Sequence, residues 1–367
     1  MLGCYILLVA IILILSKAFL FNSGSRKDEK RIIILTFILL IFVFGCRNGT
    51  YVYVSEDLHN YYNYYIKAIR SNNLVLFFSS TPDTERGYLM INWLLSRIVK
   101  WPQFIFFFEA AFCCGVTLRF IYKYSQNVLF AVLGFMSLGI MGFYMTAFRQ
   151  SMAISVCLLA LEMADKKKKI AFTILVLLAM SFHQTAIVFF PVYFIMRMKI
   201  DKLLMIAEIG FLLVIGKFVP YIIVLGNKIF HRNFGGSYTG SRLGGLINIL
   251  IGIFIIGVTA YQLDGYRWFI YAKKKKTKEF FSLENRYSNF RFLYILILGV
   301  GVYAMRYEAL ILERISMYYT PVMFVMLPGS IENGFKEKDK RLLKIIFTIG
   351  MLFLIYWRMG QLRYVFF

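Results

Sequence analysis

The sequence is poor in acidic residues, histidine and cysteine. Its 367 residues hold 19 Asp and Glu against 42 Lys and Arg, with three His and five Cys. The cysteines lie in or beside apolar runs without metal-ligand spacing, and their odd number gives no disulfide framework, so we expect packing residues. GxGxxG, Walker, HExxH and DxD patterns are also missing. Their absence argues against a nucleotide-driven pump and against a metal-dependent nucleotide-sugar transferase.

What the sequence has instead is apolar length. It is 60% hydrophobic and 18% aromatic with a mean hydropathy of +0.67, which lies outside the soluble globular range. Lipid leaves backbone groups no partner except their own helix, so we predict an all-α, polytopic transmembrane helix bundle of about 12 spans. It would form a single integral membrane domain over residues 1–367, with the run Leu2 to Phe21 retained as a span. The apolar runs are roughly 4–21, 32–46, 103–121, 128–146, 148–164, 170–183, 184–197, 203–225, 244–263, 290–305, 314–330 and 345–362.

The net charge of +23 lies mainly in short connections between these runs. Such lysines and arginines set membrane orientation, so we expect them to face the cytoplasm and expect no nucleic-acid partner. Keeping them on one side makes residues 170–197 a short hairpin with Phe182-His183-Gln184 at its tip, the alternative being one tilted span. Residues 47–102 then form one long external segment, in which Gly87 to Lys100 lies at the interface or re-enters.

On this topology a set of polar side chains converges on the outer face. The guanidinium fork suits phosphate and a helix N-terminus adds positive potential, so Arg149 and Arg314, each expected at a helix start, would form an anion clamp. Interfacial snorkelling is the alternative for both. Asp57 and Glu85 would serve as a general base or as solvated loop charges. His183 would be functional or a hydrogen-bonded packing residue.

Two further groups of residues leave more than one interpretation open. Tyrosines of the external segment suit sugar faces, although an interfacial aromatic belt would use them equally well. Charges inside apolar runs can mark ion paths, but neither a pair of broken helices nor a two-half symmetry accompanies them. These charges are Glu109, Glu162, Glu208 and Lys217.

Four short motifs follow one another in a fixed order along the first half of the chain. They are Arg47 followed by Asp57, Tyr61 and Tyr65; Glu85-Arg86-Gly87-Tyr88; Phe148-Arg149-Gln150-Ser151-Met152-Ala153; and Ser181-Phe182-His183-Gln184-Thr185-Ala186. Together these motifs resemble the Wzy-like exopolysaccharide polymerases of the EpsG type, over most of residues 30–200. The segment YVYVSE departs from the family pattern as an insertion, and the chain after residue 200 matches only in hydropathy.

The resemblance implies polymerisation of polyprenyl-pyrophosphate-linked oligosaccharide repeat units at the outer face of a bacterial cytoplasmic membrane. The fold would be similar to the GT-C membrane glycosyltransferases. No cofactor or metal is required, although Asp57 and Glu85 could bind a metal. Partners would be the lipid-linked glycan and the bilayer, with room for a chain-length regulator and a flippase. The expected catalytic residues are Asp57, Glu85, Arg149 and His183, and the expected substrate-binding residues are Arg47, Tyr61, Tyr65, Arg86, Gln150 and Arg314.

Two other functions stay open on the sequence. One is a membrane O-acyltransferase that modifies glycan with His183 as base. The other is a non-enzymatic flippase or transporter of lipid-linked sugars.

Overall fold

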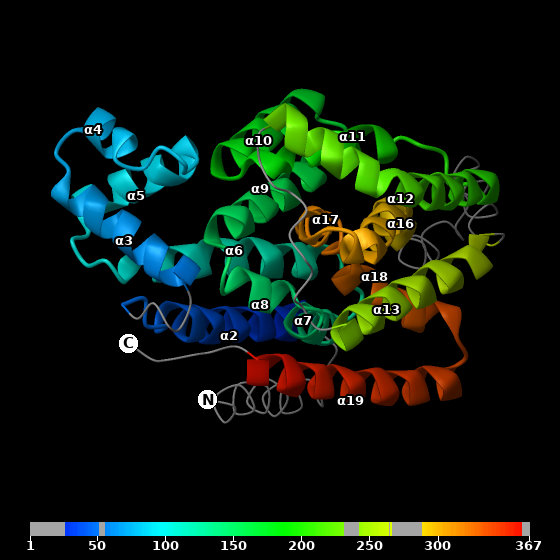
Figure 1. The fold of residues 1–367 in the computed structure, drawn as a ribbon. Helices are drawn as coiled ribbons and strands as arrows, with labels where there is room; N and C mark the ends of the chain where they lie inside the picture. The colour runs from blue at the N-terminus through cyan, green and yellow to red at the C-terminus, as the bar shows by residue number, and fades with distance from the viewer. Residues whose placement is uncertain (1–25, 51–55, 231–241, 264, 266–287, 362–367) are drawn as a thin grey trace. The chain divides into compact units, whose positions relative to one another are not determined.

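The computed structural model describes residues 26–50, 56–230, 242–263, 265 and 288–361. These residues form helices and no strand (Figure 1), which confirms the predicted all-helical class. The predicted first span lies outside the described residues. The chain divides into two compact units, Met1–Lys123 with Phe135–Ile187 and Met351–Phe367, and Tyr124–Gly134 with Val188–Gly350. Each unit is described by itself below.

The first unit is built around α9, which is apolar and buried on almost every side. Two of its polar residues, Ser151 and Ser155, satisfy their hydroxyls by bonding back to the carbonyls of Ala147 and Ser151, both at 2.9 Å. Helix α9 packs on α10 and α8, while α5 packs on α3, α4 and α10. The helices of this unit are α2 (Arg26–Gly45), α3 (Glu56–Arg70), α4 (Leu74–Ser79), α5 (Arg86–Ile98), α6 (Phe104–Tyr124), α8 (Ile140–Tyr144), α9 (Phe148–Asp165) and α10 (Lys169–Phe182).

The segment predicted to be external folds into helices α3, α4 and α5, which share a small core. Ala68, Phe77 and Leu89, one from each helix, are buried against one another, and Trp93 packs beside them. Asn73 begins α4 by accepting the backbone N–H of Val75 at 2.8 Å and of Leu76 at 3.4 Å. This core holds the N-terminus of α5 in place.

In the second unit α16 is the central helix and packs against α12, α13 and α17. The long helix α12 instead exposes much of its apolar side-chain surface, as a lipid-facing helix would. The helices of this unit are α11 (Val192–Ile195), α12 (Lys202–Phe230), α13 (Arg242–Tyr261), η2 (Ser288–Phe292), α16 (Leu293–Ala304), η3 (Met305–Tyr307), α17 (Leu310–Ser316) and α18 (Val322–Gly334). Besides α6, whose last residue Tyr124 belongs to the second unit, three elements have residues in both units: α7 (Val128–Ser137), η1 (Gln184–Phe189) and α19 (Glu337–Gln361).

Three helices within the described residues are long and apolar enough to cross a membrane: Phe104–Tyr124, Lys202–Leu225 and Phe290–Tyr307. Shorter apolar helices accompany them at Val128–Ser137, Lys169–Phe182, Gln184–Ile195 and Gly245–Tyr261. A helical membrane protein is therefore supported, while the count of about 12 spans stays a prediction. So do the single integral membrane domain, the external position of residues 47–102 and the likeness to GT-C folds.

Two predicted spans are broken where hydropathy alone gave no signal. The run 128–146 divides into α7 and α8 at Gly139, whose φ of +96° is a left-handed conformation that favours glycine. The run 314–330 was expected to begin a helix at Arg314. That expectation is wrong, because α17 begins at Leu310 after an extended Ala309 and carries Arg314 in its last turn. The predicted break at His183 is confirmed, because α10 ends at Phe182 and His183 is extended.

Candidate functional site

The first unit brings Arg149 and Glu85 together from two helix N-termini. Arg149 is the second residue of α9, and Glu85 is the N-cap residue of α5. The Glu85 side chain makes no capping bond to its own helix and instead forms an ion pair with Arg149 Nη1. The Arg149 side chain is 27% exposed and that of Glu85 is 14% exposed. The predicted helix-start position of Arg149 is confirmed, and the positive end of α9 adds to its field.

Tyr61 of α3 fixes the other side of the Arg149 guanidinium. Its hydroxyl is hydrogen-bonded with Arg149. Its ring stacks on Phe148 at 4.7 Å between centroids with an angle of 7°, and meets Tyr88 edge-on at 5.6 Å. Burial raises the pKa of Tyr61 to about 12, opposed by the Arg149 charge and reinforced by the Asp57 carboxylate. Tyr61 is therefore a neutral hydroxyl donor and acceptor at physiological pH.

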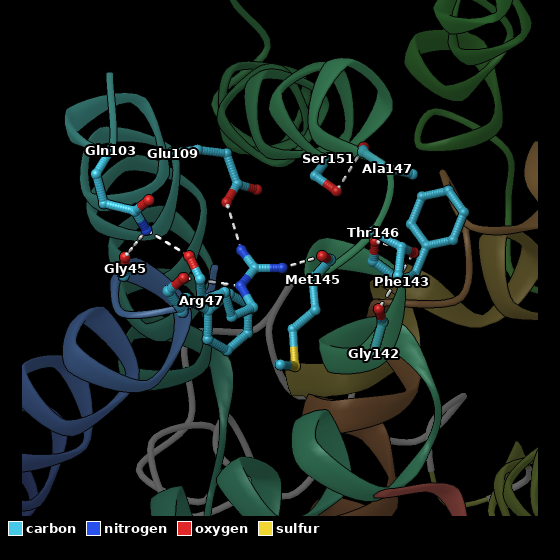
Figure 2. A network of polar contacts seen from close by, with 11 residues as sticks. Gly45, Arg47, Gln103, Glu109, Gly142, Phe143, Met145, Thr146, Ala147 and Ser151 are labelled. Carbon is cyan, nitrogen blue, oxygen red and sulfur yellow. Dashed lines mark hydrogen bonds and ion pairs between the residues drawn. The ribbon is translucent and has the colours of Figure 1, made fainter. Parts of the chain in front are cut away.

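Arg47 is more buried than Arg149, and its guanidinium donates hydrogen bonds to backbone carbonyls (Figure 2). Its Nε donates to the Phe44 carbonyl at 2.7 Å, and Nη1 donates to the Met145 carbonyl. The side chain is 3% exposed, and Nη2 lies 3.9 Å from Glu109 Oε2. Phe44 is in the last turn of α2 and Met145 is the C-cap of α8. Arg47 thus places a positive charge at the negative ends of two helices.

Gln103 and Glu109 complete this buried network. The Gln103 amide donates to the carbonyl of Gly45 at 2.6 Å and to that of Arg47, which satisfies the C-terminus of α2. Glu109 of α6 is 0% exposed, and both of its carboxylate oxygens are buried. The Cys113 thiol, a weak donor, lies beside the carboxylate. Arg47 supplies its compensating charge.

Phe148 lies between the buried network of Arg47 and the ion pair of Arg149. Its ring lies 5.2 Å from the Arg47 guanidinium carbon and stacks on Tyr61, which binds Arg149. The resemblance already contained this residue, but an aromatic side chain in an apolar run signals packing and not a site. Tyr88 was likewise noted only as part of a motif, and it is buried against Tyr61.

His183 follows α10, a helix that makes a close contact with α5 in the first unit. A Cβ at Gly87 of α5 would collide with Ser181 of α10, so the two motifs that contain these residues touch. His183 Nδ1 accepts the backbone N–H of Thr185 at 3.4 Å and lies 2.7 Å from the Thr185 hydroxyl. A backbone N–H can only donate, so Nδ1 is the accepting nitrogen. In the neutral ring Nε2 therefore carries the hydrogen.

The other predicted site residues lie elsewhere in the structure. Tyr65 donates to the Val99 carbonyl at 3.0 Å and is buried, which raises its pKa to about 12. Arg86 is exposed and donates to the Phe78 carbonyl at 2.7 Å. Asp57 is exposed, and Gln150 is buried on α9. Arg314 belongs to the second unit. Their roles stay predictions.

Among the described residues there is no group of three or more His, Cys, Asp and Glu that could hold a metal ion. Cys46, Cys113, Cys114 and Cys157 are free, and the last three are buried, which confirms packing roles for these three. Cys4 lies outside the described residues.

These features define a helical membrane protein with an arginine and carboxylate network at paired helix ends. A model of the EpsG family matches residues 30–364, so the chain belongs to the EpsG family, which confirms the resemblance carried by the four motifs. No curated protein and no solved structure matches the chain. Family membership supports a role in polysaccharide polymerisation of the glycosyltransferase type.

Proposed function

We propose that this protein polymerises lipid-linked oligosaccharide repeat units by glycosyl transfer at the outer face of a bacterial cytoplasmic membrane. A hydroxyl of the incoming unit attacks the anomeric carbon of a glycan carried on polyprenyl pyrophosphate. The new C–O bond replaces the bond to the phosphate oxygen, the pyrophosphate leaves with the electron pair, and the hydroxyl proton passes to a protein base. Family membership and the membrane helices support this scheme.

The observation that carries the proposal is the position of Arg149. It is a partly exposed guanidinium at the N-terminus of α9, and its buried Nε has no hydrogen-bond partner among the described residues. A leaving pyrophosphate develops negative charge, which a fixed cation and free helix N–H groups stabilise. Tyr61, Tyr88 and Phe148 are buried and pack against one another, so Arg149 stands on a fixed aromatic core.

The three candidate bases differ in their contacts. Glu85 is held by Arg149, Asp57 is exposed next to Tyr61, and His183 Nδ1 accepts hydrogen bonds from Thr185. Because the occupied nitrogen of His183 is its acceptor, this arrangement favours His183 as a donor to substrate oxygen through Nε2. The carboxylates are left as proton acceptors.

The test replaces Arg149 and His183 individually by alanine, with Arg70→Ala, an exposed arginine at the end of α3, as control. Membrane expression is confirmed first, and the lipid-linked glycan is then resolved by gel. Loss of one transition-state donor typically lowers turnover about 10²- to 10³-fold, so Arg149→Ala should leave unpolymerised units while Arg70→Ala makes long chains. Unchanged long-chain polymer in both site variants would refute the proposed roles.

A further inference from the structure

The ion pair between Glu85 and Arg149 occupies the two groups that the proposed reaction needs. Glu85 stands at the N-cap of α5 with φ −60° and ψ 133°, and its carboxylate makes no bond to the helix that it begins. It points to Arg149 instead. As long as this pair is closed, the guanidinium is partly neutralised and the Glu85 carboxylate is held by Arg149.

Arg149 can exchange this partner for another anion without leaving its place. Tyr61 binds the guanidinium from α3 and is itself held by its stack on Phe148. The Arg149 Nε is buried and without a partner among the described residues, so it adds a second donor toward an incoming anion. A guanidinium binds a phosphate best through two parallel N–H groups, a geometry that competes directly with Glu85.

We propose that the donor pyrophosphate displaces Glu85 from Arg149, and that the released Glu85 accepts the proton of the attacking hydroxyl. This inference rests on the proposed function. In the step, the O–H bond of the acceptor breaks and its proton goes to Glu85, the oxygen bonds to the anomeric carbon, and the pyrophosphate leaves with the electron pair. Arg149 keeps an anionic partner throughout while Glu85 becomes neutral.

Charge balance is the physical reason for the exchange. An uncompensated charge in a partly buried site is costly, so a free Glu85 carboxylate and an unpaired Arg149 are both unfavourable. When one anion replaces another on Arg149, the guanidinium is never left unpaired. Protonation of Glu85 then removes the free carboxylate charge. The consequence is an order of events, because the acceptor hydroxyl is activated only after the donor is bound.

The test measures binding and turnover separately in the full-length protein with Glu85→Gln. The probe for binding is geranyl diphosphate, titrated against protein in lipid nanodiscs. Removal of the competing ion pair should tighten binding up to about tenfold, a change that corresponds to about 1.4 kcal/mol. Polymer formation should fall at least about 100-fold, a loss typical of a removed acid–base group. A residue with a merely structural role would lower both.

Asp83→Asn is the matched control, since Asp83 is an exposed carboxylate two residues before Glu85, and it should leave both quantities unchanged. Unchanged or weaker geranyl diphosphate binding by Glu85→Gln overturns the exchange, and retained polymer formation overturns Glu85 as proton acceptor. If Glu85→Gln fails to reach the membrane, Glu85→Asp decides, with tighter binding and residual turnover expected and equal binding as refutation. Wild-type protein that neither binds the probe nor forms polymer refutes the proposed function itself.

Discussion

The buried pair of Arg47 and Glu109 allows a quantitative test of what holds the site together. Both side chains are almost fully buried, and their closest charged atoms are 3.9 Å apart. Two unit charges about 4 Å apart attract by about 4 kcal/mol at an effective dielectric constant of about 20. Removing one partner from such a pair leaves an uncompensated buried charge and typically costs about 3–5 kcal/mol.

We therefore expect Glu109→Met to lower the free energy of unfolding by about 3–4 kcal/mol. Arg47→Met should cost at least as much, because it also removes the bonds to the carbonyls of Phe44 and Met145. The double variant should be more stable than the sum of the single losses predicts, with a coupling of about 2–4 kcal/mol. Reversible unfolding by SDS in mixed micelles, followed by tryptophan fluorescence, measures all four proteins of the cycle.

The control cycle uses Lys344 and Glu332, an ion pair whose side chains are 37% and 26% exposed. Solvent screens that pair, so its coupling should stay below about 1 kcal/mol. A coupling for Arg47 and Glu109 no larger than the control value would refute the argument that Glu109 compensates Arg47.

Three further predictions concern single contacts of the site. Because burial raises the pKa of Tyr61 to about 12, its stabilising contribution is complete below pH 10 and is lost as the pH rises toward 12. The unfolding temperature should therefore fall more steeply between pH 10 and pH 12 in the wild-type protein than in Tyr61→Phe. Gly87→Ala should lower the unfolding temperature through its collision with Ser181, whereas Gly210→Ala, with nothing within 4 Å of the added Cβ, should maintain or raise it; equal effects would disprove the close contact. Thr185→Val should slow polymer formation and Thr185→Ser should retain it, because only serine keeps the side-chain hydroxyl that lies 2.7 Å from His183 Nδ1; equal rates of polymer formation in both variants would contradict this.

Helix positions could largely be predicted from hydropathy, because most apolar runs of the described chain coincide with helices. The ends could not. Gly139 divides one run because its backbone is left-handed, and Ala309 and Pro321 set the boundaries around Arg314. These are properties of backbone conformation that mean hydropathy does not contain. The helix break at His183 was predictable because keeping the basic connections on one side of the membrane requires residues 170–197 to turn back at this point.

The site was predictable in its charged members and not in its packing. Arg149 and Glu85 were expected to converge, and the structure pairs them. Phe148 and Tyr88 gave no signal, since aromatic residues in an apolar chain are ordinarily core residues. Glu109 did give one, as a carboxylate inside an apolar run, but without its partner Arg47 it pointed equally to an ion path. Only the fold shows that the two charges meet.

Arg47 and Arg149, which the sequence placed at one site, have different contacts in the structure. Arg47 donates from Nε and Nη1 to backbone carbonyls at the ends of α2 and α8, and its Nη2 faces Glu109. These contacts stabilise the two helix ends. A cation committed in this way contributes to an anionic ligand mainly through its field, which Glu109 largely cancels. Arg149 is partly exposed, and its ion-pair partner Glu85 can be replaced by another anion. Its Nε is a further N–H donor, without a hydrogen-bond partner among the described residues. Charge that develops on a leaving group must therefore be stabilised chiefly by Arg149, while Arg47 stabilises the ends of α2 and α8.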